Sequence, residues 1–133
     1  MHGGGFISGS AKCHQKYTRN WANQTDSLIV SVDYRLAPEN PFPAALNDCW
    51  QVYFWLLSNA EQFLGIKPEN VVLTGDSAGA HLACTVTILA ILRQVRVPTG
   101  LMLSYGIYDF DFSKFYPSDL FSVDDPILTL GYT

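Results

Sequence analysis

Apolar residues along the chain alternate between short runs of strand length and longer stretches with helical spacing. The short runs lie at 27–34, 69–74 and 101–105 and are typical of strands buried in a sheet. The longer stretches lie at 44–57 and 78–92, and the second is apolar nearly all round, so we expect that helix to be buried. The order strand, helix, strand, helix, strand predicts a βαβαβ unit. This is an α/β fold class, with a mostly parallel sheet of about three strands and helices on both faces.

Two further segments connect these elements. Residues 10–23 are mostly polar, with aromatic residues at helical spacing, and predict a surface helix. Residues 35–43 contain three prolines and predict a stiff, non-helical connection. We expect Arg35 in this connection to form a structural ion pair with Glu39 or Asp48 rather than to contact a substrate.

Composition narrows the class of protein. The chain has 133 residues, of which 48% are hydrophobic and 15% charged, as in a globular domain. The net charge is -4 and the basic residues are scattered, which argues against nucleic acid as a partner. Cys13, Cys49 and Cys84 fit no metal or redox spacing and indicate reduced thiols. With no signal peptide and no apolar run long enough to span a membrane, the sequence predicts a soluble cytoplasmic protein without a metal or a cofactor.

The ends of the chain predict a fragment. The chain opens directly on a glycine-rich loop, and residues 106–133 show no clear period, which we interpret as a loop or lid. Three strands are few for such a sheet and would leave unpaired edges. We therefore expect residues 1–133 to form a single truncated domain of a longer protein.

The strongest candidate for a catalytic residue is a serine near the centre of the chain. The second predicted strand runs directly into Gly75-Asp76-Ser77-Ala78-Gly79, and the second predicted helix follows. Strand, G-x-S-x-G, helix is the context of a nucleophile elbow, in which a tight turn exposes the serine. Side chains larger than hydrogen at Gly75 and Gly79 would collide with the neighbouring strand and helix. The motif alone is modest evidence, but its placement favours Ser77 as a nucleophile.

A second glycine motif lies at the start of the chain. His2-Gly3-Gly4-Gly5 can present backbone N–H groups without obstruction by Cβ atoms. Taken alone, it could equally be a flexible tail, whereas the known phosphate-loop patterns are absent. Together with a nucleophilic serine, the N–H groups of Gly4, Gly5 and Ala78 would form an oxyanion hole, with Gly3 as an alternative donor.

These motifs together resemble the hormone-sensitive lipase family of α/β-hydrolases. The resemblance rests on four segments: residues 2–5, 33–39, 41–46 and 75–79. Residues 95–100 and 125–128 resemble its lipase members more than its bacterial esterases.

The resemblance implies a partial α/β-hydrolase fold and hydrolysis of acylglycerols, sterol esters or shorter acyl esters through an acyl-enzyme on Ser77. It places the Gly3–Gly5 loop in the oxyanion hole, and it makes His2, Gly75, Asp76 and Gly79 motif residues that shape the site. It leaves association with a lipid surface or lipid droplet open, and nothing in the sequence indicates an oligomeric state.

In this family the acid and the base of the catalytic triad follow the serine in the chain. The present sequence departs from that pattern. After Ser77 the sequence has one histidine, His81, which lies in the helix at the elbow and which we expect to be structural. His14 precedes the serine and is expected to be solvated. Five acidic residues follow the last predicted strand without a base to orient: Asp109, Asp111, Asp119, Asp124 and Asp125.

Three functions follow as hypotheses. The first is a serine esterase or lipase whose isolated 133-residue chain turns over little, because Ser77 lacks its base. The second is a non-catalytic binding or regulatory module that pairs with another chain through its exposed sheet edges or apolar face. The third, a peptidase or thioesterase with the same elbow, is disfavoured by the glycine loop.

Overall fold

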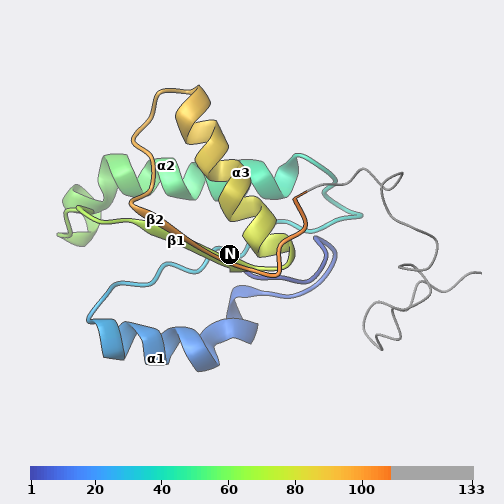
Figure 1. Cartoon of the computed structure of the whole chain (residues 1–133), viewed down its shortest axis with the longest axis horizontal. Coiled ribbons are helices and arrows are strands. Elements are labelled where there is room, and N and C mark those ends of the chain that lie inside the picture. Colours follow the sequence, from blue (N-terminus) through green and yellow to red (C-terminus); the bar gives the residue numbers. More distant parts are fainter. Residues whose placement is uncertain (109–133) are drawn as a thin grey trace, which may run out of the picture.

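Two parallel strands form the sheet in the computed structural model, which describes residues 1–108 (Figure 1). The elements in chain order are a 3-10 helix (Ala11–His14), α1 (Gln15–Thr25), α2 (Ala44–Leu64), β1 (Val72–Asp76), α3 (Ala78–Leu92) and β2 (Gly100–Ser104). In the sheet, Val72 of β1 lies beside Gly100 of β2, and Asp76 beside Ser104. Helix α1 lies on one side of the sheet, and α2 and α3 lie on the other (Figure 1). The predicted α/β class with helices on both faces is therefore confirmed.

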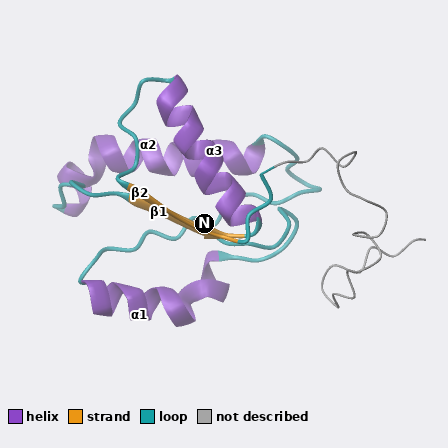
Figure 2. Cartoon of the chain, in the orientation of Figure 1, coloured by secondary structure: helices purple, strands orange, loops and turns teal. Residues whose placement is uncertain are grey.

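The predicted strand at 27–34 is wrong for the described residues. The sheet there has two strands, and the whole connection between α1 and α2 is loop (Figure 2). Burial on both faces is wrong as well, because Leu28 is 58% exposed. Residues 29–32 line a cavity of about 30 Å³ together with Thr74 and Gly75 of β1. A strand needs a hydrogen-bonded neighbour, and apolar content alone does not supply one. The βαβαβ prediction is thus reduced to β1, α3 and β2.

The helices differ from prediction in extent and burial. Helix α2 continues to Leu64, seven residues past the predicted end, and stops where Gly65 adopts a left-handed φ of +67°. Helix α3 has the predicted bounds. Its burial all round is wrong, because Ile91 and Leu92 are 60% and 73% exposed. Helix α2 and the sheet cover one face of α3, and no other described element packs on the opposite face.

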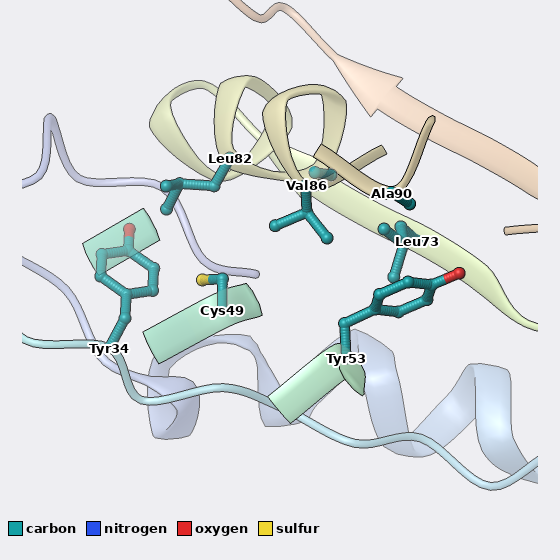
Figure 3. Packing of buried hydrophobic residues seen from close by; sticks show 8 residues of the cluster. Tyr34, Cys49, Tyr53, Leu73, Leu82, Val86 and Ala90 are labelled. Atoms are coloured by element: carbon teal, nitrogen blue, oxygen red, sulfur yellow. The ribbon is translucent and has the colours of Figure 1, made fainter. Parts of the chain in front are cut away.

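The core lies where α2, α3 and β1 meet (Figure 3). Its buried members are Tyr34, Cys49, Tyr53, Leu73, Leu82, Ala83, Val86 and Ala90. Burial of this apolar surface fixes α3 against β1. The junction between β1 and α3, which contains Ser77, is thereby held at the edge of the core.

Candidate active site

Ser77 occupies a strained turn between β1 and α3. Its φ of +50° and ψ of -119° lie outside the regions that non-glycine residues normally adopt, a conformation that costs about 1–3 kcal/mol. Two backbone bonds hold the turn: the Ser77 N–H donates to the carbonyl of Ser104 at 2.9 Å, and the His81 N–H donates to the carbonyl of Ser77 at 3.1 Å. This is the backbone geometry predicted for a nucleophile elbow.

The two glycines of the motif allow close backbone approaches. A Cβ atom on Gly75 would lie 2.3 Å from the carbonyl group of Gly79, at the start of α3. A Cβ atom on Gly79 would lie 2.3 Å from the carbonyl oxygen of Met1. Gly79 therefore makes room for the N-terminal segment, and not for a described strand as the sequence suggested.

The glycine loop is bound directly to the elbow. The N–H of Gly3 donates to Oδ1 of Asp76 at 3.2 Å, and the Met1 amino group donates to the carbonyl of Thr74 at 2.8 Å. Gly4 and Gly5 have φ values of +121° and +62°, which favour glycine. The loop predicted to supply oxyanion donors thus lies beside Ser77 and is not a free tail.

His2 anchors this loop in the interior. Its side chain is 2% exposed, and its ring stacks on that of Tyr34 with centroids 4.1 Å apart. The Tyr34 hydroxyl donates to the carbonyl of His2 at 2.6 Å, and Nδ1 of His2 lies 2.8 Å from the carbonyl of Gly3. Burial raises the pKa of Tyr34, so its hydroxyl stays a donor at neutral pH. Sequence reasoning missed Tyr34 as a support of this loop, although Tyr34 lies in residues 33–39, one of the segments that carry the family resemblance.

Asp76 joins the loop, the elbow and the first helices. Its Oδ1 atom accepts the N–H of Gly3 and lies 3.5 Å from Nδ1 of His14. The side chains of His14 and Asp76 are both 21% exposed, so the expectation that His14 is merely solvated is wrong. No spacing in the sequence pointed to this contact, because it joins the end of the 3-10 helix to the end of β1.

The histidine at the elbow helix packs against neighbouring segments. Nδ1 of His81 lies 2.9 Å from the carbonyl of Ile107, which requires the proton on Nδ1. Its ring meets that of Phe6 edge to face, with centroids 5.9 Å apart. The five candidate acids between Asp109 and Asp125 lie outside the described residues.

The proline-rich connection is tied to the first turns of α2. Arg35 donates from Nε and Nη2 to the Asp48 carboxylate, with distances of 3.0 and 2.9 Å, and its backbone N–H donates to the same carboxylate at 2.9 Å. The Arg35 hydrogen bonds lower the pKa of Asp48. The predicted structural ion pair is confirmed, with Asp48 and not Glu39 as the partner.

Comparisons with known proteins identify the family of the chain. A family model of the alpha/beta hydrolase fold matches residues 1–132. The chain is 43% identical over 131 residues to hormone-sensitive lipase from Mus musculus, covering 98% of the chain and 17% of the lipase. It is 38% identical over 129 residues to carboxylesterase NlhH from Mycobacterium tuberculosis, covering 96% of the chain and 39% of the esterase. The resemblance to the hormone-sensitive lipase family is therefore confirmed.

Solved structures show the same likeness. The thermostable carboxylesterase EstE1, cloned from a metagenomic library, superposes with a TM-score of 0.75 at 40% identity, covering 80% of this chain and 36% of EstE1. The esterase from Pyrobaculum calidifontis gives a TM-score of 0.74 at 40% identity, covering 79% of this chain and 34% of that one. The chain thus spans well under half the length of these relatives.

Proposed function

The chain belongs to the α/β-hydrolase family, and on that premise we propose that it is the part of a carboxylic-ester hydrolase that carries the nucleophile, Ser77. One observation carries the proposal: the glycine loop is hydrogen-bonded to Asp76, the residue that immediately precedes the strained Ser77. This bond supports the proposal because acyl transfer requires a nucleophile and a set of backbone donors in one place. Lipases and carboxylesterases among the similar proteins support ester hydrolysis as the reaction.

The proposed reaction begins with attack by Ser77 Oγ on the ester carbonyl. A bond forms between Oγ and the carbonyl carbon, the serine proton passes to a base, and the carbonyl oxygen becomes an oxyanion. The N–H of Ala78, at the start of α3, and those of Gly4 and Gly5 receive this charge. Gly3 is the less suitable donor, because its N–H already binds Asp76. Loss of one such donor typically costs about 2.7–4 kcal/mol of transition-state stabilisation.

The bond to the alcohol then breaks, and the alcohol leaves with the proton from the base. Water attacks the acyl-enzyme, releases the carboxylic acid and returns the proton to Ser77. We assign the base to a histidine outside residues 1–133, because His81 binds the carbonyl of Ile107 and packs on Phe6. The isolated chain is then expected to keep only the effects of the oxyanion hole and of binding, about 10³–10⁴-fold over water.

We propose acylglycerols, sterol esters or shorter acyl esters as substrates, since the similar proteins include an animal lipase and bacterial carboxylesterases. A cytoplasmic location with access to lipid droplets is part of the proposal. The three unpaired cysteines suit a reducing compartment and so support the cytoplasmic part of this proposal. Among residues 1–108, no helix combines the length and apolarity needed to cross a membrane.

Covalent capture with chemical rescue tests the proposal. The chain is treated with a fluorophosphonate, with and without imidazole, and the modified residue is identified by mass spectrometry. We expect slow labelling of Ser77 that imidazole accelerates, because imidazole replaces the absent base. Ser77→Ala should abolish labelling, and Ser31→Ala, at an exposed serine, should not change it.

Two outcomes would contradict parts of the proposal. Labelling that is fast without imidazole would place the base inside the chain. A folded chain that is never labelled at Ser77 would contradict the nucleophile assignment and favour the non-catalytic binding module.

A further inference from the structure

The carboxylate of Asp76 lies between the glycine loop and the end of the 3-10 helix. On the loop side, its Oδ1 atom accepts the N–H of Gly3 at 3.2 Å. A Cβ atom on Gly3 would lie 2.9 Å from the carbonyl oxygen of Asp76 and would overlap Oδ2, so the approach requires glycine. On the helix side, Nδ1 of His14 lies 3.5 Å from Oδ1. We call these three groups, the His14 imidazole, the Asp76 carboxylate and the Gly3 N–H, the loop anchor.

One backbone donor does not compensate the Asp76 carboxylate. The side chain is only 21% exposed, and an ionised carboxylate has about four acceptor sites. A charge removed from water is costly unless it is paired. Within residues 1–108, the basic side chain paired with Asp76 is that of His14. Without the imidazole, the carboxylate would gain by turning toward solvent, and it would then release the N–H of Gly3.

Contacts on two sides hold the imidazole of His14. Its ring centroid lies 5.1 Å from that of Tyr17, one turn further along the chain, and it meets the ring of the buried His2 edge to face at 6.2 Å. The Thr18 hydroxyl donates to the carbonyl of His14 at 3.0 Å. The ring is therefore enclosed between α1 and the glycine loop. A ring held in this way can fix the orientation of a carboxylate, whereas a freely rotating side chain could not.

Gly3 leads directly into a hydrogen-bonded turn. The carbonyl of Gly4 accepts two backbone N–H groups, from Ile7 at 3.1 Å and from Ser8 at 3.0 Å. A change in the position of Gly3 therefore displaces the turn as a unit, together with its proposed oxyanion donors. Because Asp76 immediately precedes the nucleophile, the loop anchor ties these donors to the residue beside it.

We propose that His14 is a positioning residue for the reaction at Ser77, an inference that rests on the proposed function. The imidazole orients the Asp76 carboxylate, the carboxylate holds the N–H of Gly3, and the turn after Gly3 then presents its donors where the oxyanion forms. His14 acts through Asp76 and takes no proton from the serine in this role. A displacement of about 1 Å at a reacting group can cost about 100-fold in rate, so an anchor outside the site has a measurable effect.

Amide NMR detects the loop anchor without any reaction. His14→Phe keeps a ring beside Tyr17 but removes Nδ1, so the Gly3 amide proton should shift upfield as its bond to Asp76 lengthens. His14→Asn places a side-chain N–H near the position of Nδ1 and should return the Gly3 signal toward its natural position. Thr18→Ala is the matched control, because it removes a bond at the same helix junction without touching Asp76. It should leave the Gly3 signal unchanged.

The kinetics of fluorophosphonate labelling connect the loop anchor to the nucleophile. With saturating reagent and imidazole, His14→Phe should reduce the rate constant for labelling of Ser77 by about 10–100-fold. The reagent concentration that gives half this rate should change by less than about twofold, because the donors receive charge only as the covalent bond forms. His14→Asn should recover the rate constant to within about threefold, since its N–H still meets an ionised acceptor. In Asp76→Ala, His14→Phe should have no further effect, because the group through which it acts is gone.

Four results would overturn the inference. They are a folded His14→Phe chain with the natural Gly3 signal and rate, a His14→Asn chain as slow as His14→Phe, a Thr18→Ala chain equally slow, and a His14→Phe effect that persists in Asp76→Ala. If His14→Phe does not fold, His14→Leu replaces it, because leucine has nearly the shape of asparagine without the N–H. A Gly3 signal that responds as expected in a chain never labelled at Ser77 would support the link from His14 to Gly3 and contradict the proposed function.

Discussion

Substitution of Gly75 tests whether the elbow depends on close contact between β1 and α3. In Gly75→Ala the new Cβ atom would lie 2.3 Å from the carbonyl group of Gly79 and 2.7 Å from the backbone nitrogen of Ala80. These are backbone atoms at the start of α3, so no side-chain rotation relieves the overlap. The helix must move away from the strand, together with the N–H of Ala78.

Gly100 provides a matched control, because it lies in the neighbouring strand and a Cβ atom there would meet only Val72 Cγ2 at an ordinary 3.7 Å. Alanine in place of strand glycine gains about 0.5–1 kcal/mol at either position, because the unfolded chain loses freedom. At residue 75 this gain is opposed by overpacking, which costs about 1–3 kcal/mol of stability. We therefore expect Gly100→Ala to be as stable as the natural chain or slightly more stable, and Gly75→Ala to be less stable than Gly100→Ala by about 1–3 kcal/mol.

Urea unfolding followed by far-ultraviolet circular dichroism measures this difference. Gly75→Ala should also slow fluorophosphonate labelling in imidazole, because the Ala78 donor moves with the helix. Equal unfolding free energies for the two variants would refute the reasoning, since the overlap at residue 75 would then be relieved without cost.

Two further predictions concern titratable groups. The lowered folded-state pKa of Asp48 means that its pairing with Arg35 stabilises the fold fully above the ordinary aspartate pKa of about 3.9, and that this contribution is lost progressively as the pH falls from there through the lower pKa of the folded state. Arg35→Met should therefore lower the urea midpoint more at about pH 6 than at about pH 3, and an equal loss at both would contradict the assignment. Burial raises the pKa of Cys49 to about 12, so in native chain iodoacetamide should modify the exposed Cys13 and spare Cys49, as read by mass spectrometry. Rapid modification of Cys49 without urea would show that the core opens readily.

Much of the candidate site was predictable because its signals are local. The turn at Ser77 needs glycines at fixed offsets, and its flanking strand and helix have their own short-range patterns, so the sequence predicted α3 to its bounds and the elbow between 75 and 79. The motif at 2–5 predicted a donor loop, but only the structure shows its hydrogen bond to Asp76. The pairing of Arg35 required a choice between two acids, which the position of α2 decided.

The sequence by itself determined the α/β class, the presence of the three α-helices and the glycine positions of the turn at 75–79, because these depend on neighbours within a few positions. The tertiary structure decided what depends on distant neighbours. Residues 27–34 have strand composition but no ladder partner in the described chain, and the outer face of α3 is apolar but uncovered. His14 meets Asp76, and Phe6 meets α3, only because the sheet brings these segments together. Local patterns set the backbone conformation, and packing sets which of those elements pair, are buried or enclose a pocket.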